Sequence, residues 1–166
     1  MEKKNQEESQ YLTFLSGTEV FGIGILHVKE IKEYASVTTI PMMPEYVKGV
    51  INLRGNVVPI IDLPVRFGRE KSIISKRTCI IIVEIAFEDE SMDIGILVDA
   101  VNEVIDIPAD LIEPPPSFGS KIRIEFIEGI GKLENQFVIL LNVNKTLSVS
   151  ELSVIEERVN SEVSAS

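Results

Sequence analysis

The chain has no tryptophan, one cysteine and one histidine among its 166 residues. A single cysteine cannot form an intramolecular disulfide, and Cys79 with His27 is too small a ligand set for a zinc site. We therefore expect no metal and no other cofactor. Cys79 begins an apolar run that ends at Val83, which favours a small buried side chain.

Basic residues are also scarce: 16 Lys and Arg stand against 26 Asp and Glu, a formal net charge of −10. Nucleic acid and anionic membrane surfaces repel such a chain, and no basic patch with interleaved aromatics offsets this. No run approaches the ~18 apolar residues of a membrane helix, and residues 1–10 lack the apolar segment of a signal peptide. We expect a cytoplasmic protein with no nucleic-acid partner and no direct membrane insertion.

Aliphatic residues supply what the aromatics do not. Hydrophobic residues make up 45% of the chain and aromatic residues only 6%, so Ile, Val and Leu must form the core. These residues favour strands, and they occur here in short runs separated by turns. The pattern predicts a mainly β protein of one compact domain or two small barrels.

Residues 48–63 read as a β-hairpin, with two apolar strands joined by a polar turn at residues 54–56. Gly55 and Asn56 tolerate positive φ, so we expect them to form the turn. Arg54 then lies at the rim of the hairpin on an aliphatic background. It is either a solvated or salt-bridged turn residue, or an arginine presented to a partner protein.

The apolar pattern occurs twice, which indicates an internal duplication. Each copy has enough short strands, about five, to close a small barrel, and the groove between two packed barrels is a natural binding place. One series pairs Ile23, Ile25, Val28, Glu30 and Ile31 with Ile96, Val98, Val101, Glu103 and Val104, at an offset of 73. A second pairs Gly49, Val50, Leu53, Val58, Ile60, Ile61 and Leu63 with Gly129, Ile130, Leu133, Val138, Leu140, Leu141 and Val143, at an offset of 80.

Helical spacing occurs at a few places. Val28, Ile31 and Tyr34 predict one or two helical turns, and residues 100–105 suggest another. Pro44 can begin a short helix through residue 48. Ser148 and Glu151 have capping-box spacing and predict a C-terminal helix, whose apolar face is Leu152, Ile155 and Val159.

The run from Gly49 to Gly55, followed by Val58 to Leu63, resembles the signature of the CheW family of bacterial chemotaxis coupling proteins. The resemblance extends from about Gln10 to about Leu147 and includes residues 95–99. It implies an all-β fold with short helices, built as two SH3-like five-stranded barrels. The same fold occurs as the regulatory domain of the CheA histidine kinase and in CheV. No kinase or receiver domain fits in 166 residues, so the free adaptor is the best match.

The expected domain boundaries follow from this resemblance and the repeats. Residues 1–9 are predicted to be a disordered tail, and residues 10–147 the CheW-like domain. Within it, the first repeat covers about 10–66 and the second about 77–147. Residues 148–166 form the C-terminal helix and tail.

The resemblance implies a non-enzymatic scaffold that links the cytoplasmic tip of a chemoreceptor to the CheA regulatory domain. An aliphatic groove would receive the amphipathic receptor hairpin, Arg54 would contact receptor or kinase, and four motif residues would set backbone geometry. The groove residues are Leu12, Ile25, Val28, Ile31 and Val98; the motif residues are Gly49, Asn52, Gly55 and Pro59.

Two alternatives remain at this point. The chain could be an adaptor in a related receptor–kinase array outside chemotaxis, which the sequence does not separate from the first function. An enzyme using a pair of carboxylates is the other, although nothing points to one. His27 has no nucleophile motif nearby, and residues 129–132 lack the upstream glycine of a phosphate-binding loop.

Overall fold

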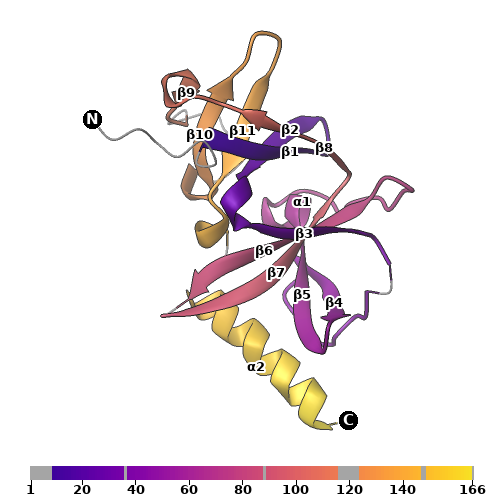
Figure 1. The fold of residues 1–166 in the computed structure, drawn as a ribbon. Helices are drawn as coiled ribbons and strands as arrows, with labels where there is room; N and C mark the ends of the chain where they lie inside the picture. Colours follow the sequence, from indigo (N-terminus) through magenta and orange to yellow (C-terminus); the bar gives the residue numbers. More distant parts are fainter. Residues whose placement is uncertain (1–8, 36, 88, 116–123, 147–148, 166) are drawn as a thin grey trace.

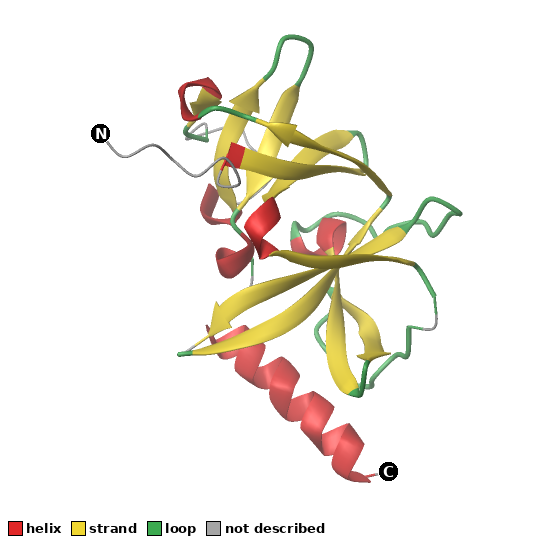
Figure 2. Cartoon of the chain, in the orientation of Figure 1, coloured by secondary structure: helices red, strands yellow, loops and turns green. Residues whose placement is uncertain are grey.

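The computed structural model describes residues 9–35, 37–87, 89–115, 124–146 and 149–165 (Figure 1). The predicted N-terminal tail, except for Ser9, and the predicted cap residue Ser148 lie outside these ranges. Two curled β-sheets lie one above the other, and a C-terminal helix runs along the lower one (Figures 1 and 2). The predicted mainly β class is confirmed.

The upper sheet has six strands in the order β8-β1-β2-β11-β10-β9, and the lower has five in the order β3-β6-β7-β5-β4. The sixth strand is β9, a two-residue addition to the five strands expected of each barrel. The upper strands are β1 (Gln10–Ser16), β2 (Glu19–Gly24), β8 (Ala100–Asp106), β9 (Ile112–Glu113), β10 (Ile127–Lys132) and β11 (Phe137–Leu141). The lower strands are β3 (Val28–Glu33), β4 (Val47–Leu53), β5 (Asn56–Asp62), β6 (Cys79–Phe87) and β7 (Glu90–Val98).

Six short or terminal helices complete the described chain. The α-helices are α1 (Leu63–Arg66) and α2 (Val149–Ala165), and the 3-10 helices are η2 (Ile25–His27), η3 (Ala109–Leu111), η4 (Ile124–Phe126) and η5 (Val143–Lys145).

Each sheet contains strands from both halves of the sequence. The lower sheet takes β3, β4 and β5 from the first half and β6 and β7 from the second, while the upper sheet takes β1 and β2 from the first half and the rest from the second. The lower sheet is therefore one continuous stretch of chain from β3 to β7, inserted between the two parts of the upper sheet. The sequence repeats are not the spatial subdomains.

Strand pairing confirms the duplication residue by residue. In the parallel pairs, Ile60 lies opposite Gly95 in the lower sheet and Leu140 lies opposite Gly22 in the upper one. These pairs correspond at the offsets of the two repeated series. The hairpins β4–β5 and β10–β11 also have the same register, with an irregularity two residues before the equivalent glycines, Gly49 and Gly129.

The predicted helical turns at Val28–Tyr34 and residues 100–105 are wrong, because β3 and β8 occupy these positions. A β-bulge explains the error. Val28 and Ile31 lie opposite Val83 and Ile81, so three residue steps on β3 match two on β6. Val101 and Val104 are placed in the same way opposite Phe14 and Leu12. Because of the extra residue, consecutive inward-facing side chains are three residues apart in the sequence instead of two, and a spacing of three is typical of a helix. The short helix expected after Pro44 is also absent, and a turn leads into β4.

The buried side chains form three clusters. Each sheet curls over a small cluster of its own, one containing Ile60 and Leu97 and the other Val138 and Leu140. The largest cluster lies between the sheets and contains residues of both, together with Leu152 and Ile155 of α2. A chain of stacked rings runs through it from Phe14 through Phe21 and Phe67 to Phe126, with centroids 5.7–5.8 Å apart.

Arg66 holds α2 against this shared core. Its guanidinium group lies 4.8 Å from the ring centroid of Tyr46 and 4.6 Å from that of Phe126. It donates to the Thr146 carbonyl oxygen at 2.7 Å and to Glu151 at 2.8 Å. Burial, together with the Glu151 carboxylate, raises the pKa of Tyr46 to about 12, so its hydroxyl stays protonated and donates to Glu151. The predicted C-terminal helix is thus present and continues to Ala165.

Gly49 should tolerate no side chain, because the chain crosses close to β4 at this point. A Cβ atom there would lie 2.4 Å from the Thr38 carbonyl oxygen, and Thr38 pairs with Val50 through two hydrogen bonds of 2.8 Å. We expect Gly49→Ala to lower the free energy of unfolding by about 1–3 kcal/mol in chemical denaturation. Gly24→Ala is the matched control, with its nearest atom at 3.4 Å, and should change stability by about 0.5 kcal/mol or less. Equal effects would contradict this role of Gly49.

Candidate functional site

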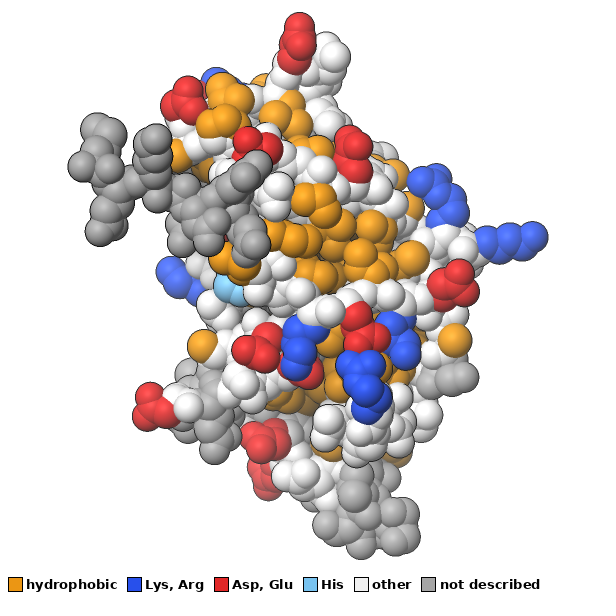
Figure 3. All heavy atoms as spheres, viewed as in Figure 1, with side chains coloured by type: hydrophobic (Ala, Val, Ile, Leu, Met, Phe, Trp, Pro, Cys, Tyr) orange, Lys and Arg blue, Asp and Glu red, His pale blue; other side chains and the backbone are white. Residues whose placement is uncertain are grey.

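Strand β3 pairs with β6, and β8 pairs with β1, so each joins a strand from the other half of the sequence, and we call these two the exchanged strands. Both are edge strands of their sheets. They flank the shared core on one face of the molecule. Figure 3 shows hydrophobic side chains gathered on the face between β8 and β3, with charged side chains below and beside them. We call this apolar surface the inter-sheet groove, lined by Val28 and Ile31 of β3 and by Val101 and Val104 of β8.

Strand register fixes the direction of these four side chains. Directly paired residues of antiparallel strands point to the same face. Ile31 pairs with Ile81, and Val104 pairs with Leu12, and both partners belong to the shared core. Ile31 is 45% exposed and Val104 is 46% exposed, so each covers part of the core and leaves the rest of its surface to solvent.

The structure brings together only part of the predicted groove. Val28 and Ile25 are half-buried and pack against the shared core, and Ile31 is exposed beside them. Leu12 and Val98 are instead core residues, 3% and 0% exposed, so they do not line the exposed surface, and their contact with a partner stays a prediction. Leu12 lies beneath Val104 and supports the groove, because the two residues are cross-strand partners.

Val101 and Val104 were missed as groove residues, although the sequence contained the signal. They correspond to Val28 and Ile31 in the first repeated series, at the offset of 73. Val28 pairs with Val83 of β6 in the lower sheet, and Val101 pairs with Phe14 of β1 in the upper sheet. Val83 and Phe14 therefore occupy equivalent positions in the two sheets. The groove is therefore pseudo-symmetric, with one valine and one further aliphatic residue from each side.

Cys79 lies at one end of the groove. It pairs with Glu33 at the end of β3, and its thiol meets the backbone of Val101 in β8. Burial and then the Glu33 carboxylate raise the pKa of this thiol, while a hydrogen bond with the Val101 backbone opposes the shift. The thiol is therefore mostly protonated at neutral pH and reacts slowly.

Arg54 occupies a strained turn. Leu53 pairs with Asn56, so Arg54 and Gly55 are the two loop residues, with φ of 50° and 88°. The predicted tight hairpin is present, but the residue with positive φ beside Gly55 is Arg54 and not Asn56, which begins β5. A two-residue turn of this type needs positive φ at both central positions, and the strand register places Arg54 at one of them. The equivalent turn residues Glu134 and Asn135 do not have positive φ.

An ion pair links Arg54 to Glu30 of β3. The arginine side chain is 69% exposed, and its hydrogen bond holds the pKa of the Glu30 carboxyl below its usual value. Neighbouring residues of a strand point to opposite faces, so this pair lies across β3 from Ile31. Arg54 therefore does not line the groove and instead borders the other side of the same edge strand.

The remaining motif residues set backbone geometry. The Asn52 side chain accepts a hydrogen bond from the Gly55 N–H at 2.9 Å, which braces the turn. Gly49 permits the close crossing described above, and Pro59 is buried in β5 opposite Val50.

The described ranges contain no candidate metal cluster and no candidate membrane-spanning helix. No group of three or more His, Cys, Asp or Glu side chains in them could hold a metal ion. Within the same ranges, no helix has the length and apolar character needed to cross a bilayer.

Comparison with known proteins gives consistent results over nearly the whole chain. The family model of the CheW-like domain matches residues 10–151. The chain is 37% identical over 147 residues to the chemotaxis protein CheW of Klebsiella aerogenes, covering 89% of this chain and 86% of that protein. It is 27% identical over 144 residues to Protein FrzA of Myxococcus xanthus, covering 86% and 88%. The crystal structure of the scaffolding protein TtCheW from Thermoanaerobacter tengcongensis has a TM-score of 0.78 and 37% identity, covering 91% and 95%.

Arg54→Gly should leave the fold intact. A non-glycine residue in the left-handed region costs about 1 kcal/mol, which glycine avoids, and an exposed ion pair contributes little in water. We expect the free energy of unfolding to change by less than about 1 kcal/mol, since glycine also adds entropy to the unfolded chain. Arg54→Ala keeps the unfavourable φ and should be no more stable than Arg54→Gly. A collapse of thermal stability in Arg54→Gly, followed by circular dichroism, would show that the ion pair is structural.

Proposed function

The chain belongs to the CheW family, and from this premise we propose that it is a non-enzymatic scaffold that couples chemoreceptor tips to the regulatory domain of the CheA histidine kinase. The main structural support for this proposal is the inter-sheet groove. It is the apolar face that both halves of the fold build together, and its residues are only partly covered by the protein itself.

The chemistry of the groove suits an amphipathic helical partner such as a receptor hairpin. Its four lining side chains are aliphatic and offer no directional hydrogen bonds, so they can accept an apolar stripe of helical residues. Covering the exposed part of one such side chain stabilises a complex by about 1 kcal/mol before the cost of association. A pair of edge strands with bulges also resists pairing with a further strand, which favours a helix as the occupant.

Arg54 supports a second contact on the far side of β3. The arginine is held in an uncommon backbone conformation, is largely exposed, and pairs with the same strand that lines the groove. A partner that binds Arg54 therefore contacts β3 on the face opposite the inter-sheet groove. We assign this contact to receptor or kinase positioning, and we expect Arg54→Gly to reduce assembly of the three-component complex while retaining the fold.

A second candidate is an adaptor in a receptor–kinase array outside chemotaxis, since the name of the similar Protein FrzA, unlike that of CheW of Klebsiella aerogenes, does not refer to chemotaxis. The same groove and the same arginine would serve there, because both depend only on an amphipathic helical partner and a regulatory domain of the same fold.

A charge in the groove should block receptor binding. We expect Ile31→Asp, and independently Val104→Asp, to weaken binding of a chemoreceptor cytoplasmic fragment roughly tenfold or more in calorimetry, because each places a carboxylate in an apolar contact. Binding of a CheA regulatory domain should change much less. Leu111→Asp is the control, since Leu111 is 40% exposed but belongs to η3. Failure of the parent protein to bind either partner at tens of micromolar would overturn the proposed function.

Cys79 should report occupation of the groove directly. It is the only cysteine in the chain and lies at the groove end, so a thiol reagent labels one site. Because its pKa is raised, labelling should be slow near neutral pH and accelerate as the pH rises. A saturating receptor fragment should slow labelling at a fixed pH, whereas an unchanged rate would place the receptor elsewhere.

A further inference from the structure

The loop of residues 69–77 is basic in an acidic protein. It contains Arg69, Lys71, Lys76 and Arg77 but only Glu70 among the acidic residues, a net charge of +3. The whole chain carries −10, so the rest of the chain carries −13 (−10 minus +3). This loop joins α1 to β6 and lies outside both repeated series.

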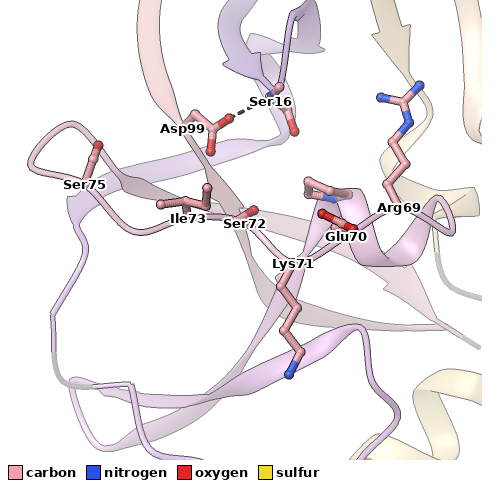
Figure 4. A pocket seen from close by; sticks show the side chains of 10 residues that line it. Ser16, Arg69, Glu70, Lys71, Ser72, Ile73, Ser75 and Asp99 are labelled. Atoms are coloured by element: carbon pink, nitrogen blue, oxygen red, sulfur yellow. Dashed lines mark hydrogen bonds between the residues drawn. The ribbon is translucent and has the colours of Figure 1, made fainter.

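The loop lies at one end of the inter-sheet groove. Its last residue precedes Thr78, whose carbonyl oxygen accepts a hydrogen bond from the N–H of Tyr34, just beyond β3, at 3.1 Å. On its other side the loop faces Asp99, the residue before β8, across a cavity of about 370 Å³. Asp99 is fixed there by the Gly17 N–H at 2.7 Å, and Figure 4 shows Ile73 and Ser72 on the loop with Asp99 and Ser16 opposite. The loop therefore borders both the end of β3 and the start of β8.

Hydrogen bonds hold the loop in place at several points. Ser72 donates from its N–H and from its hydroxyl to the buried carboxylate of Asp62, at 3.1 Å and 2.7 Å. Arg69 forms an ion pair with Glu19, and its N–H donates to the Pro64 carbonyl oxygen at 2.8 Å. The conformation is thus built before any partner arrives, which lowers the entropy cost of binding.

Between these anchors the loop exposes apolar surface and cations. Ile73 is 85% exposed, more than any other large hydrophobic residue among those described, and Ile74 is exposed beside it. Lys71, Lys76 and Arg77 form no ion pair within the described ranges, whereas Arg54, Arg66 and Arg69 each have one. A fixed loop that presents an isoleucine among unpaired cations has the composition of a contact surface.

We propose that the loop of residues 69–77 is a second docking element, which binds an acidic segment of the same partner helix that occupies the inter-sheet groove. This proposal rests on the proposed function. The apolar stripe of the helix lies on Ile31 and Val104, and its continuation passes over the loop. There an aliphatic residue of the helix packs on Ile73, and its carboxylates approach Lys76 and Arg77.

Charge complementarity favours a protein segment over an anionic membrane or a nucleic acid. A bilayer or a duplex presents negative charge over a wide area, and the −13 carried by the rest of the chain opposes its approach. A short acidic segment meets only the loop, because at physiological ionic strength charges beyond about 8 Å are largely screened. The loop thus selects partners by charge and sets the direction in which the helix lies.

The test uses full-length protein, a chemoreceptor cytoplasmic fragment as the probe, and calorimetry at 0.15 M and 1 M salt. Ile73→Ala should weaken binding about tenfold at both salt concentrations, since it removes apolar contact. Lys76→Glu/Arg77→Glu should weaken binding about fivefold to tenfold at 0.15 M salt and far less at 1 M. Both sites are exposed, so folding should be unaffected.

Matched controls carry the same changes away from the groove. Lys145→Glu/Arg158→Glu changes the net charge by the same amount at exposed residues of η5 and α2, and Phe137→Ala removes a 64% exposed side chain at the far hairpin. Both controls should bind the receptor fragment as the parent does. Equal losses in controls and loop variants would overturn the loop proposal while leaving the proposed function intact.

Two further outcomes separate the remaining possibilities. Absence of receptor binding by the parent protein would overturn the proposed function itself. Vesicles containing about 30% phosphatidylserine serve as the membrane arm, and we expect no binding to them. Vesicle binding that is lost in Lys76→Glu/Arg77→Glu would show that the loop recognises a membrane and would overturn the protein-segment proposal.

Discussion

Burial of apolar surface between the two sheets is the constraint on which the rest of the structure depends. Each sheet has a small cluster of its own, but the largest buried cluster takes residues from both sheets and from α2. Neither half of the sequence can form it alone, because β3 pairs with the second half and β8 with the first. Because these strands pair across the two halves, the two duplicated units share one core. Arg66 then fixes α2 against that core through a carboxylate, a carbonyl oxygen and two aromatic rings.

The inter-sheet groove follows from the same exchange. The exchanged strands are the edges of their sheets, so each is paired on one side only among the strands that the structure describes. Their bulges turn Val28, Ile31, Val101 and Val104 toward the shared core at a place that no other described strand covers. Under the proposed function, a partner helix in the groove would contact both subdomains at once. The loop of residues 69–77 borders one end of the groove, whereas Arg54 lies on the opposite face of β3, so the two proposed contacts do not overlap.

The sequence predicted the mainly β class, the duplication and the hairpin of residues 48–63, because alternation, apolar repeats and turn residues are local signals. It mistook β3 and β8 for helices, since a bulge replaces the spacing of two by a spacing of three. It placed Leu12 and Val98 in the groove, because an aliphatic residue in a strand gives no sign of whether it faces the core or solvent. Val101 and Val104 could have been found by carrying Val28 and Ile31 across the duplication. Which sheet each strand joins depends on long-range pairing, and no local pattern contains it.

The most direct test of the central claim is an NMR titration of methyl-labelled protein with a chemoreceptor cytoplasmic fragment. If one groove is built by both exchanged strands, the methyl resonances of Val28 and Ile31 in β3 and of Val101 and Val104 in β8 should shift together, with a single apparent dissociation constant. Methyl groups in the hairpin β10–β11, such as that of Val138, should remain unchanged. Shifts confined to one strand, or centred on the β10–β11 hairpin, would contradict the shared groove.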